Sequence, residues 1–523
     1  MIFEYIAYNE PLIKNNTLDD LKFFGMNTLS KETIEKIKER PTHAHTKTLA
    51  LVIEKEMSKY GLDDAQRENI EKLKNGHRVI IGGQQAGLLM SPSYILHKII
   101  TLFILQNDVK KKFDYDAIPV FWIAGEDHDY EEVNHTHVYD GYHNRVKKIS
   151  YKPNLTVPMS IGFYDFDKKA MKSVIDEMFN YLNDNPKLVQ IKEVLVQKLE
   201  DYHSWTDFFT ALVHELFKDK GLLIVNAHSK DIRELEKETF KKMFNNHEII
   251  DAAFRSGQEK FTSHFNIDKT IETETNVHLF VNSTDRRALL KYEDGFYRTE
   301  DNEYTKDEVL ALIENDTVQM SNNVVTRPVM QESLFNTLIF VGGGAEVKYW
   351  GELSEVFETL EIPMPLVVKR MEFMYIPKEI DKKLEKYQLT FSKNLLEDIE
   401  KKRKELEKNN ENSRLLKALK KQEAKVMNQY DDLKHCCQSD WERQLIESNF
   451  KAQMKQVDYL KRRYKIEAMR KIREELSDLK KIEQILLPFG VLQERIYHPL
   501  IFFTDIWDYS PLVYHENLVL IKE

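Results

Sequence analysis

The most informative segment of the chain is Ala117-Ile118-Pro119-Val120-Phe121-Trp122-Ile123-Ala124-Gly125-Glu126-Asp127-His128-Asp129. Its apolar part is typical of a strand that is buried on both faces, and Gly125 ends that strand. Ionisable side chains directly after a buried strand are costly unless they are solvated, paired or used in chemistry. We therefore take Glu126, Asp127, His128 and Asp129 as candidate catalytic residues.

A second strand is predicted just upstream, at residues 78–81, and it leads into the glycine-rich segment 82–87. Ser91-Pro92 then predicts a helix start, because apolar residues at helical spacing follow it. The order strand, helix, strand predicts a parallel sheet. Backbone N–H groups of segment 82–87 and the positive end of the helix could bind a phosphate or carboxylate; the alternative is a tight turn without a ligand.

Further strands are predicted at residues 221–225, 336–341 and 365–368, with a helix between the last two. The segment Gly342-Gly343-Gly344-Ala345-Glu346 follows the second of these strands. It is either an anion or ribose site or a close crossing of strand and helix. Ligands of open parallel sheets bind outside the carboxyl ends of the strands, where the strand order reverses. We therefore expect the three polar strand ends to surround one cleft.

The acidic segment after Gly125 has three interpretations. The functional one is general acid–base chemistry, with recognition of an amine or a magnesium-bound nucleotide. A second is a metal site, because His135 and His137 follow the acids closely. The third is a solvated acidic loop without a specific role.

Composition changes sharply between residues 377 and 487. No glycine or proline occurs from Lys378 to Leu487, and apolar residues recur at three-to-four spacing between charged flanks. This narrow apolar stripe predicts an antiparallel coiled coil, with a break between helices near residues 408–413. A homodimer through this seam is expected, and an intramolecular helical arm without dimerisation is the alternative.

Charge and cysteine content exclude several classes of protein. Lys and Arg number 76 against 86 Asp and Glu, a net charge of −10 that argues against a general nucleic-acid binder. The only cysteines, Cys436 and Cys437, are adjacent, which excludes a disulfide framework and a structural zinc site of four thiolates. The N-terminus does not resemble a secretory signal, and no apolar run is long enough to span a bilayer. We therefore expect a cytoplasmic protein without membrane contact.

Several segments together resemble the BshC family. They are residues 83–88, 92–98 and 119–129, then Asn323-Val324-Val325 with Arg327-Pro328, then Val341-Gly342-Gly343 with Glu346 and Tyr349-Trp350, and finally residues 492–495. The family joins cysteine to glucosaminyl-malate through an amide, in the last step of bacillithiol biosynthesis. The resemblance therefore implies a cysteine ligase.

The resemblance also implies an α/β fold class: a Rossmann-like parallel-sheet core with connecting-peptide insertions, similar to class I aminoacyl-tRNA synthetases, plus a long antiparallel α-helical coiled coil. The expected parts are the core (1–150 and 321–376), connecting insertions with some core strands (151–320), the coiled coil (377–487) and a C-terminal segment that packs back on the core (488–523). By analogy with the synthetases, cysteine is activated as an adenylate or phosphate, which makes ATP or ADP and Mg²⁺ the expected cofactors.

We hypothesise the following roles in the cleft. Gly83, Gln84, Gln85 and Gly87 hold a phosphate or carboxylate. Glu126, Asp127 and Asp129 bind an amino group or Mg²⁺, and His128 carries a proton, because its ordinary pKa lies near working pH. The other candidates for substrate or nucleotide contact are His97, Asn134, Arg327, Gln331, Gly342, Gly343, Glu346 and Trp350. A second nucleotide pocket would involve Gln493-Glu494-Arg495.

Relatives read Gly-Gly-Pro-Gly-Glu in the third segment, where this chain has Gly344 and Ala345 at the third and fourth places. Alanine adopts a positive φ less readily than glycine, so this turn is expected to differ. Two other functions stay open: a nucleotidyltransferase or hydrolase with another acceptor, and a coiled-coil scaffold with a vestigial nucleotide-binding core. The acidic segment favours an enzyme, since a scaffold has no use for three carboxylates beside a strand end.

Overall fold

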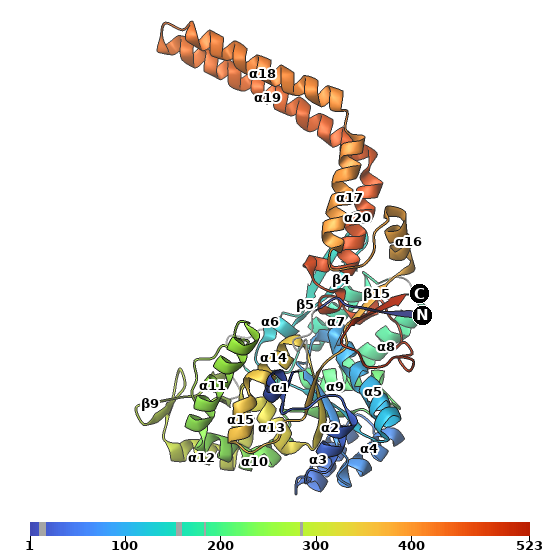
Figure 1. Cartoon of the computed structure of the whole chain (residues 1–523), viewed down its shortest axis with the longest axis vertical. Helices are drawn as coiled ribbons and strands as arrows, with labels where there is room; N and C mark the ends of the chain where they lie inside the picture. The colour runs from blue at the N-terminus through green and yellow to red at the C-terminus, as the bar shows by residue number, and fades with distance from the viewer. Residues whose placement is uncertain (10–16, 153–158, 183–184, 283–285, 523) are drawn as a thin grey trace. The chain divides into compact units, whose positions relative to one another are not determined.

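The computed structural model describes residues 1–9, 17–152, 159–182, 185–282 and 286–522. The described chain divides into two compact units (Figure 1). The core unit comprises residues 1–141, 146–375 and 492–521, and the helical unit is built mainly from residues 376–491.

The core unit contains a parallel sheet in which five strands are described, in the order β14-β13-β2-β3-β6. Their bounds are β2 Val79–Gln84, β3 Ile118–Ile123, β6 Leu223–Asn226, β13 Thr337–Gly342 and β14 Leu366–Lys369. Every neighbouring pair is parallel, with Gly83 opposite Trp122 and Ile339 opposite Leu366. The predicted parallel sheet is thus confirmed.

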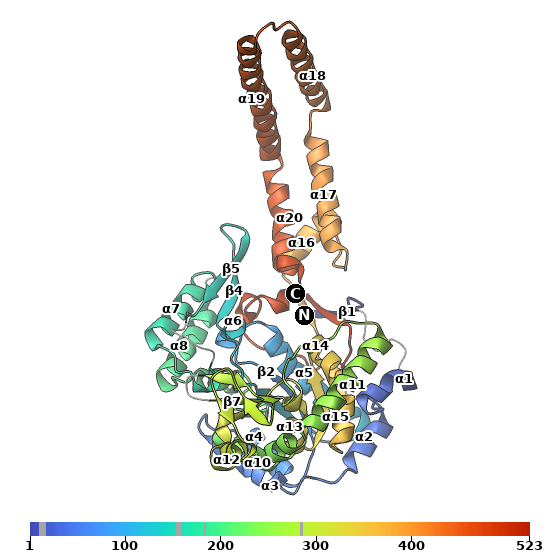
Figure 2. The same cartoon turned by 90° about the vertical axis from the view of Figure 1, so that its left-hand side faces the viewer.

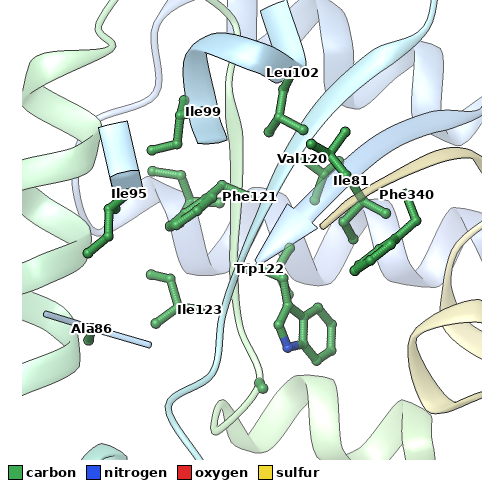
Figure 3. Close-up of a cluster of buried hydrophobic side chains, with 14 of the residues drawn as sticks. Ile81, Ala86, Ile95, Ile99, Leu102, Val120, Phe121, Trp122, Ile123 and Phe340 are labelled. Carbon is green, nitrogen blue, oxygen red and sulfur yellow. The ribbon is translucent and has the colours of Figure 1, made fainter. Parts of the chain in front are cut away.

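Strand β3 is buried from end to end because both of its faces are covered. Figure 3 shows Phe121 and Ile123 on one side of the strand and Val120 and Trp122 on the other. Helix α5 (Tyr94–Phe113) packs on β2 and β3, while α4 (Asp64–Lys74) packs against β3 and β6 and α3 (Thr46–Ser58) against β6. This burial explains why the apolar run predicted the strand correctly.

The strand order reverses beside β2. From β2 the chain moves through α5 to β3 and then to β6 on the same side, whereas β13 pairs with the opposite edge of β2. The switch point therefore lies between β2 and β13, at the carboxyl ends of these strands.

The start of α5 differs from the prediction. The helix begins at Tyr94 rather than directly after Ser91-Pro92, and the peptide bond between those two residues is cis. Leu89 and Met90 have positive φ angles, so the chain turns sharply before the helix. Ser93, the residue before the helix, is held by Tyr497, because its N–H and hydroxyl groups both donate to the Tyr497 carbonyl.

Residues between β6 and β13 form a smaller layer of the core unit. Strands β12 (Met320–Asn322), β7 (Leu279–Asn282) and β8 (Arg287–Leu289) pair antiparallel in that order. Strands β9 (Lys291–Glu293) and β10 (Phe296–Arg298) form a hairpin beyond them. Helices of this region are α10 (Lys230–Asn245), α11 (His247–Phe265), α12 (Lys306–Asn315) and α13 (Thr326–Leu334).

The helical unit consists of long antiparallel helices (Figure 2). They are α16 (Lys378–Tyr387), α17 (Leu395–Asn410), α18 (Ser413–His435), α19 (Asp440–Lys471) and α20 (Arg473–Leu486). Helix α18 packs along α19, and α17 packs against α19 and α20. The predicted break lies between α17 and α18, which confirms the coiled-coil pattern. None of the described helices is long and apolar enough to cross a membrane.

Candidate functional site

A large cavity opens at the carboxyl ends of β2 and β3, beside the start of α14 (Gly344–Glu352). Its volume is about 2090 Å³. Ligand pockets ordinarily measure about 300–1,000 Å³, so this cavity has room for more than one small molecule. All three polar segments contribute to its wall, as do the strands of the smaller layer. Its lining includes Gly83, Gln84, Gln85, Glu126, Asp127, His128, Asp129, Phe280, Arg287, Asn322, Asn323, Arg327, Ala345, Glu346 and Tyr349.

Lys98 of α5 links the end of β2 to the start of α14. Its Nζ donates to the Gly83 carbonyl at 2.5 Å, to Gln84 Oε1 at 2.9 Å and to Glu346 Oε2 at 2.5 Å. Its side chain is only 1% exposed. Burial lowers its pKa from the ordinary value, and the Glu346 carboxylate opposes that shift. Lys98 therefore holds Gln84 and Glu346 in place on the cavity wall.

Glu346 also organises the third glycine-rich segment. Its Oε2 accepts the Gly343 N–H at 2.6 Å, which caps the start of α14. A Cβ at Gly342 would lie 2.9 Å from the Glu346 Cβ, so the strand and helix cross closely at that glycine. Ala345 belongs to the first turn of α14, and neither it nor Gly343 or Gly344 is among the residues with positive φ. The alanine therefore fits this turn without strain.

Glu126 is held by a buried arginine. Arg233 of α10 donates to the Glu126 carboxylate and, at 2.7 Å, to Glu236 Oε2. All three side chains are at most 4% exposed. Burial raises the pKa of Glu236 to about 7, against the opposing effect of Arg233. Glu126 thus anchors the start of the acidic segment to α10.

Asp127 and Asp129 face different surroundings. Asp127 Oδ2 accepts from Gln85 Nε2 at 2.6 Å, and Oδ1 accepts the His128 N–H at 2.7 Å. Its side chain remains 30% exposed, so it can also meet a ligand. Asp129 is exposed and caps the short helix α6 (Tyr130–Val133), accepting the Glu132 N–H at 3.3 Å. Asp127 is consequently the carboxylate best placed toward both β2 and the cavity.

His128 contacts an arginine from the smaller layer. Arg287 Nη1 lies 2.9 Å from His128 Nδ1 and 3.5 Å from Asp127 Oδ1. Burial, and then the Arg287 cation, lower the pKa of His128, whereas Asp127 and Asp129 oppose that shift. The ordinary imidazole pKa on which the proton-carrier hypothesis rested therefore does not apply at this position.

Arg327 and Tyr349 also line the cavity. Arg327 Nη2 donates to the Tyr349 hydroxyl, and Nη1 lies 3.4 Å from Gln331 Oε1. Burial raises the pKa of Tyr349 above its ordinary value, and Arg327 opposes the rise. The phenol therefore stays neutral, and the guanidinium supplies positive charge to the cavity lining.

Several predicted contact residues lie away from the cavity lining. His97 is buried, with Nδ1 2.6 Å from Glu494 Oε2. Trp350 is fully buried and stacks on Phe340 at a ring-centroid distance of 4.2 Å. Gln331 and Asn134 are also buried and do not line the cavity. These residues support the wall rather than form it.

The glycines of segment 82–87 are explained by close packing. A Cβ at Gly82 would lie 2.9 Å from the Val341 carbonyl, and one at Gly83 would lie 2.8 Å from the Trp122 carbonyl. A Cβ at Gly87 would collide with the Ser91 carbonyl at 1.9 Å. These close approaches account for the glycines without a ligand, and phosphate or carboxylate binding by this segment stays a prediction.

The rival metal site has no cluster to support it in the described chain. His135 and His137 lie on β4 (His135–Asp140), with ring centroids 5.1 Å apart. Burial lowers the pKa of His137 to about 4. Among the described residues, no group of three or more His, Cys, Asp or Glu side chains is placed to hold a metal ion.

Sequence reasoning missed Lys98, Arg287 and Tyr349 as site residues. Lys98 left a visible signal, since it interrupts the apolar face of α5 three residues after Ile95 and four before Leu102. A lone charge inside an apolar stripe indicates a buried partner. Arg287 left no comparable signal, because its partners His128 and Asp127 are remote in the sequence.

Comparisons with known proteins cover nearly the whole chain. Residues 13–371 match the family described as bacillithiol biosynthesis BshC, N-terminal Rossmann-like domain, and residues 373–507 match its C-terminal coiled-coil domain. A Staphylococcus carnosus protein named "Putative cysteine ligase BshC" is 36% identical over 510 residues, 96% of this chain and 95% of the relative. A Staphylococcus aureus protein of the same name (bovine strain RF122) is 35% identical over 523 residues, 98% and 97% of the two chains.

Proposed function

The chain belongs to the BshC family, and from this premise we propose that it is the ligase that joins cysteine to glucosaminyl-malate in the last step of bacillithiol biosynthesis. The proposal is supported by one observation above all. A single cavity at the switch point of the sheet is lined by both the Asp127 carboxylate and the Arg327 guanidinium. An amino acid has an ammonium and a carboxylate that need these opposite charges at the same time.

Asp127 binds the ammonium group of cysteine. Its position is fixed by Gln85 and by the His128 N–H, which leaves its exposed edge available to the ligand. Arg327, with the positive end of α14, binds the cysteine carboxylate or the phosphates of a nucleotide. Lys98 does not touch the substrate but fixes Gln84 and Glu346, which line the cavity.

We propose ATP as a second substrate, because the cavity is larger than one small ligand needs and the Arg327 guanidinium lines it. It would transfer its adenylyl or γ-phosphoryl group to the cysteine carboxylate and release pyrophosphate or ADP. The amine of glucosaminyl-malate then attacks the carbonyl carbon: the new C–N bond forms, the bond from that carbon to the phosphate-bearing oxygen breaks, and AMP or phosphate leaves with the proton lost by the amine. Mg²⁺ would accompany the nucleotide and take most of its ligands from phosphates and water.

We also propose a cytoplasmic homodimer. Large apolar side chains are exposed along α18 and α19, among them Trp441 at 70%, Leu445 at 54% and Tyr459 at 55%. A seam of this kind is buried when a second helical arm packs on it. The exposed Cys436 and its neighbour Cys437 are free thiols, which suits a reducing compartment.

The test uses the purified full-length protein with cysteine, glucosaminyl-malate, ATP and Mg²⁺, and follows bacillithiol by mass spectrometry. Asp127→Asn keeps the shape of the side chain but removes its charge, so we expect turnover to fall by about 10²-fold or more. Asp165→Asn, at an exposed position outside the cavity, is the matched control. Nucleotide turnover that does not depend on cysteine would instead favour a nucleotidyltransferase or hydrolase.

A further inference from the structure

Arg287 is held rigidly at the wall of the cavity. Its Nε donates to Ser321 Oγ at 3.0 Å and its Nη2 to the Asn322 carbonyl at 2.7 Å. Its guanidinium also stacks over the Phe280 ring, with Cζ 3.9 Å from the centroid. The side chain is 6% exposed. The direction in which Nη1 points is therefore set by the smaller layer and not by solvent.

Arg287 Nη1 determines which ring nitrogen of His128 carries the proton. A guanidinium has only donors, so His128 Nδ1, at 2.9 Å from Arg287 Nη1, must accept with its lone pair. The neutral ring then carries its proton on Nε2. Among the described residues no side chain or backbone group is hydrogen-bonded to Nε2, and the imidazole is 33% exposed and lines the cavity. The N–H of Nε2 is thus free for a ligand.

Burial and the Arg287 cation favour the neutral ring, whereas the two neighbouring carboxylates favour the imidazolium. Asp127 and Asp129 lie on the same loop, with Asp127 Oδ1 3.7 Å from His128 Nδ1. Arg287 faces the ring from β8, and Phe280 of β7 packs against it at a centroid distance of 5.8 Å. Protonating Nδ1 would place two cationic donors against each other and break the contact with Arg287. The guanidinium therefore opposes the imidazolium directly.

We propose that Arg287 is a positioning residue that locks His128 as a neutral imidazole with its proton on Nε2, so that His128 donates a hydrogen bond to an anionic oxygen of the substrate and does not act as a base. The acceptor is a carboxylate oxygen of cysteine, or a phosphoryl oxygen of the acyl adenylate or acyl phosphate formed from it. The proton stays on the imidazole throughout. Neutral imidazoles can stabilise developing negative charge in this way. The catalytic part of this inference rests on the proposed function, but the protonation state does not.

The protonation state is measured by NMR on full-length protein labelled with ¹⁵N-histidine, with the His128 signals identified by their loss in His128→Gln. We expect a protonated Nε2 and an unprotonated Nδ1 from about pH 6 to pH 8, across the ordinary histidine pKa. A proton on Nδ1, or an imidazolium at neutral pH, would overturn the proposal. This readout needs no substrate, so it stands even if the ligase assay fails.

Two substitutions of His128 separate a donor from a base. The amide N–H₂ of His128→Gln can donate from nearly the place of Nε2–H but cannot take up a proton, whereas His128→Ala can do neither. We expect kcat to fall about 10²–10³-fold in the alanine variant and to stay within about tenfold of wild type in the glutamine variant. Equal losses in the two variants would refute the donor role.

Arg287→Met tests the positioning role against Arg287→Lys, which keeps a cationic donor. We expect the methionine variant to mix the two tautomers, because no donor then holds Nδ1 in the accepting state, and its turnover to fall toward that of His128→Ala. The lysine variant should retain part of the wild-type tautomer preference and part of the wild-type turnover. Arg286→Met is the matched control, because Arg286 pairs with Glu300 and Asp301 instead. An Arg287→Met protein with the wild-type tautomer would overturn the assignment.

Discussion

Lys98 is almost completely buried, and its hydrogen-bond partners compensate for that. Removing an ammonium from water costs several kcal/mol unless good hydrogen bonds replace the lost hydration. Here the acceptors are a carbonyl, an amide oxygen and the Glu346 carboxylate, all within 2.9 Å. A buried pair of this kind seldom adds net stability. We infer that it is retained to fix the cavity wall at the switch point.

Lys98→Met tests this interpretation. Removing the ammonium leaves Glu346 without its cation, so we expect a loss of about 2–4 kcal/mol in the free energy of unfolding. The double variant Lys98→Met, Glu346→Gln removes the unpaired charge and should recover most of that stability. Both variants should lose most of their turnover. A double variant that is stable and fully active would show that the pair has no role in the site.

The residues of the site were only partly predictable. The acidic segment was found because charges after a buried strand are conspicuous in any single sequence. The pairing of Glu126 with Arg233 could not be predicted, since nothing in a sequence shows which distant helix will reach a given carboxylate. Trp350 was misleading for a related reason: it follows a glycine-rich turn, but the helical phase of α14 turns it onto Phe340 in the core.

At the scale of elements, apolar runs located the strands because central parallel strands are buried on both faces. The glycine-rich segments could not be interpreted in the same way. Gly82 and Gly83 look like a phosphate loop, yet they are needed because carbonyls of Val341 and Trp122 approach them closely. Those carbonyls belong to neighbouring strands, so the reason for each glycine lies in the assembled sheet.

Gly83→Ala and Gly344→Ala form a matched pair for this explanation. A Cβ at Gly83 meets the Trp122 carbonyl at 2.8 Å, whereas one at Gly344 has no atom within 4 Å. We expect Gly83→Ala to lower the free energy of unfolding by about 1–3 kcal/mol. Gly344→Ala should be neutral or stabilise by up to about 1 kcal/mol, because the position is helical. Chemical denaturation measures the free energy of unfolding of both variants. Equal losses at the two positions would contradict the explanation that close carbonyls require the glycines of β2.

In the helical unit, the contribution of Asp478 of α20 to stability depends on pH. Burial raises its pKa, but hydrogen bonds from Lys383, Lys386 and Tyr387 lower it more strongly, to about 2. A carboxyl group with a lowered folded-state pKa stabilises the fold above its unfolded pKa of 3.8 and stops doing so as the pH falls toward 2. This carboxylate therefore secures α16 to α20 at neutral pH.

Asp478→Asn should accordingly lower the stability of the helical unit at pH 7 by about 1–3 kcal/mol. The difference from wild type should shrink as the pH falls from about 4 to about 2. Thermal melting followed by circular dichroism across this pH range measures the difference in stability. A difference that stays constant down to pH 2 would assign the stabilisation to packing and not to the ionised carboxylate.

At the scale of the whole molecule, the core unit holds both ends of the segment that leaves it. Tyr375 N donates to Gln493 Oε1 at 2.8 Å, and Gln493 Nε2 donates to the Tyr375 carbonyl at 3.1 Å. Glu494 accepts from Arg370 and from the Phe373 N–H. The chain therefore exits and returns at one place, as in a domain inserted into another.

We expect the core unit to fold when residues 377–490 are replaced by a Gly/Ser linker of about four to six residues, because the ends already meet. Light scattering should give a monomer for this variant and twice the chain mass for the full-length protein. A monomeric full-length protein at micromolar concentration would contradict the proposed homodimer. A variant without cooperative unfolding would show that the core depends on the helices.

The most direct test of the account follows oxygen from cysteine labelled with ¹⁸O at both carboxylate positions, in wild-type protein and in Asp127→Asn. If the cavity activates the cysteine carboxylate with a nucleotide, each bacillithiol keeps one ¹⁸O in its new amide and leaves the other on AMP or phosphate. The wild type should show this one-to-one transfer, and Asp127→Asn should show almost none. Bacillithiol formed without label on AMP or phosphate, or full transfer by Asp127→Asn, would contradict the account.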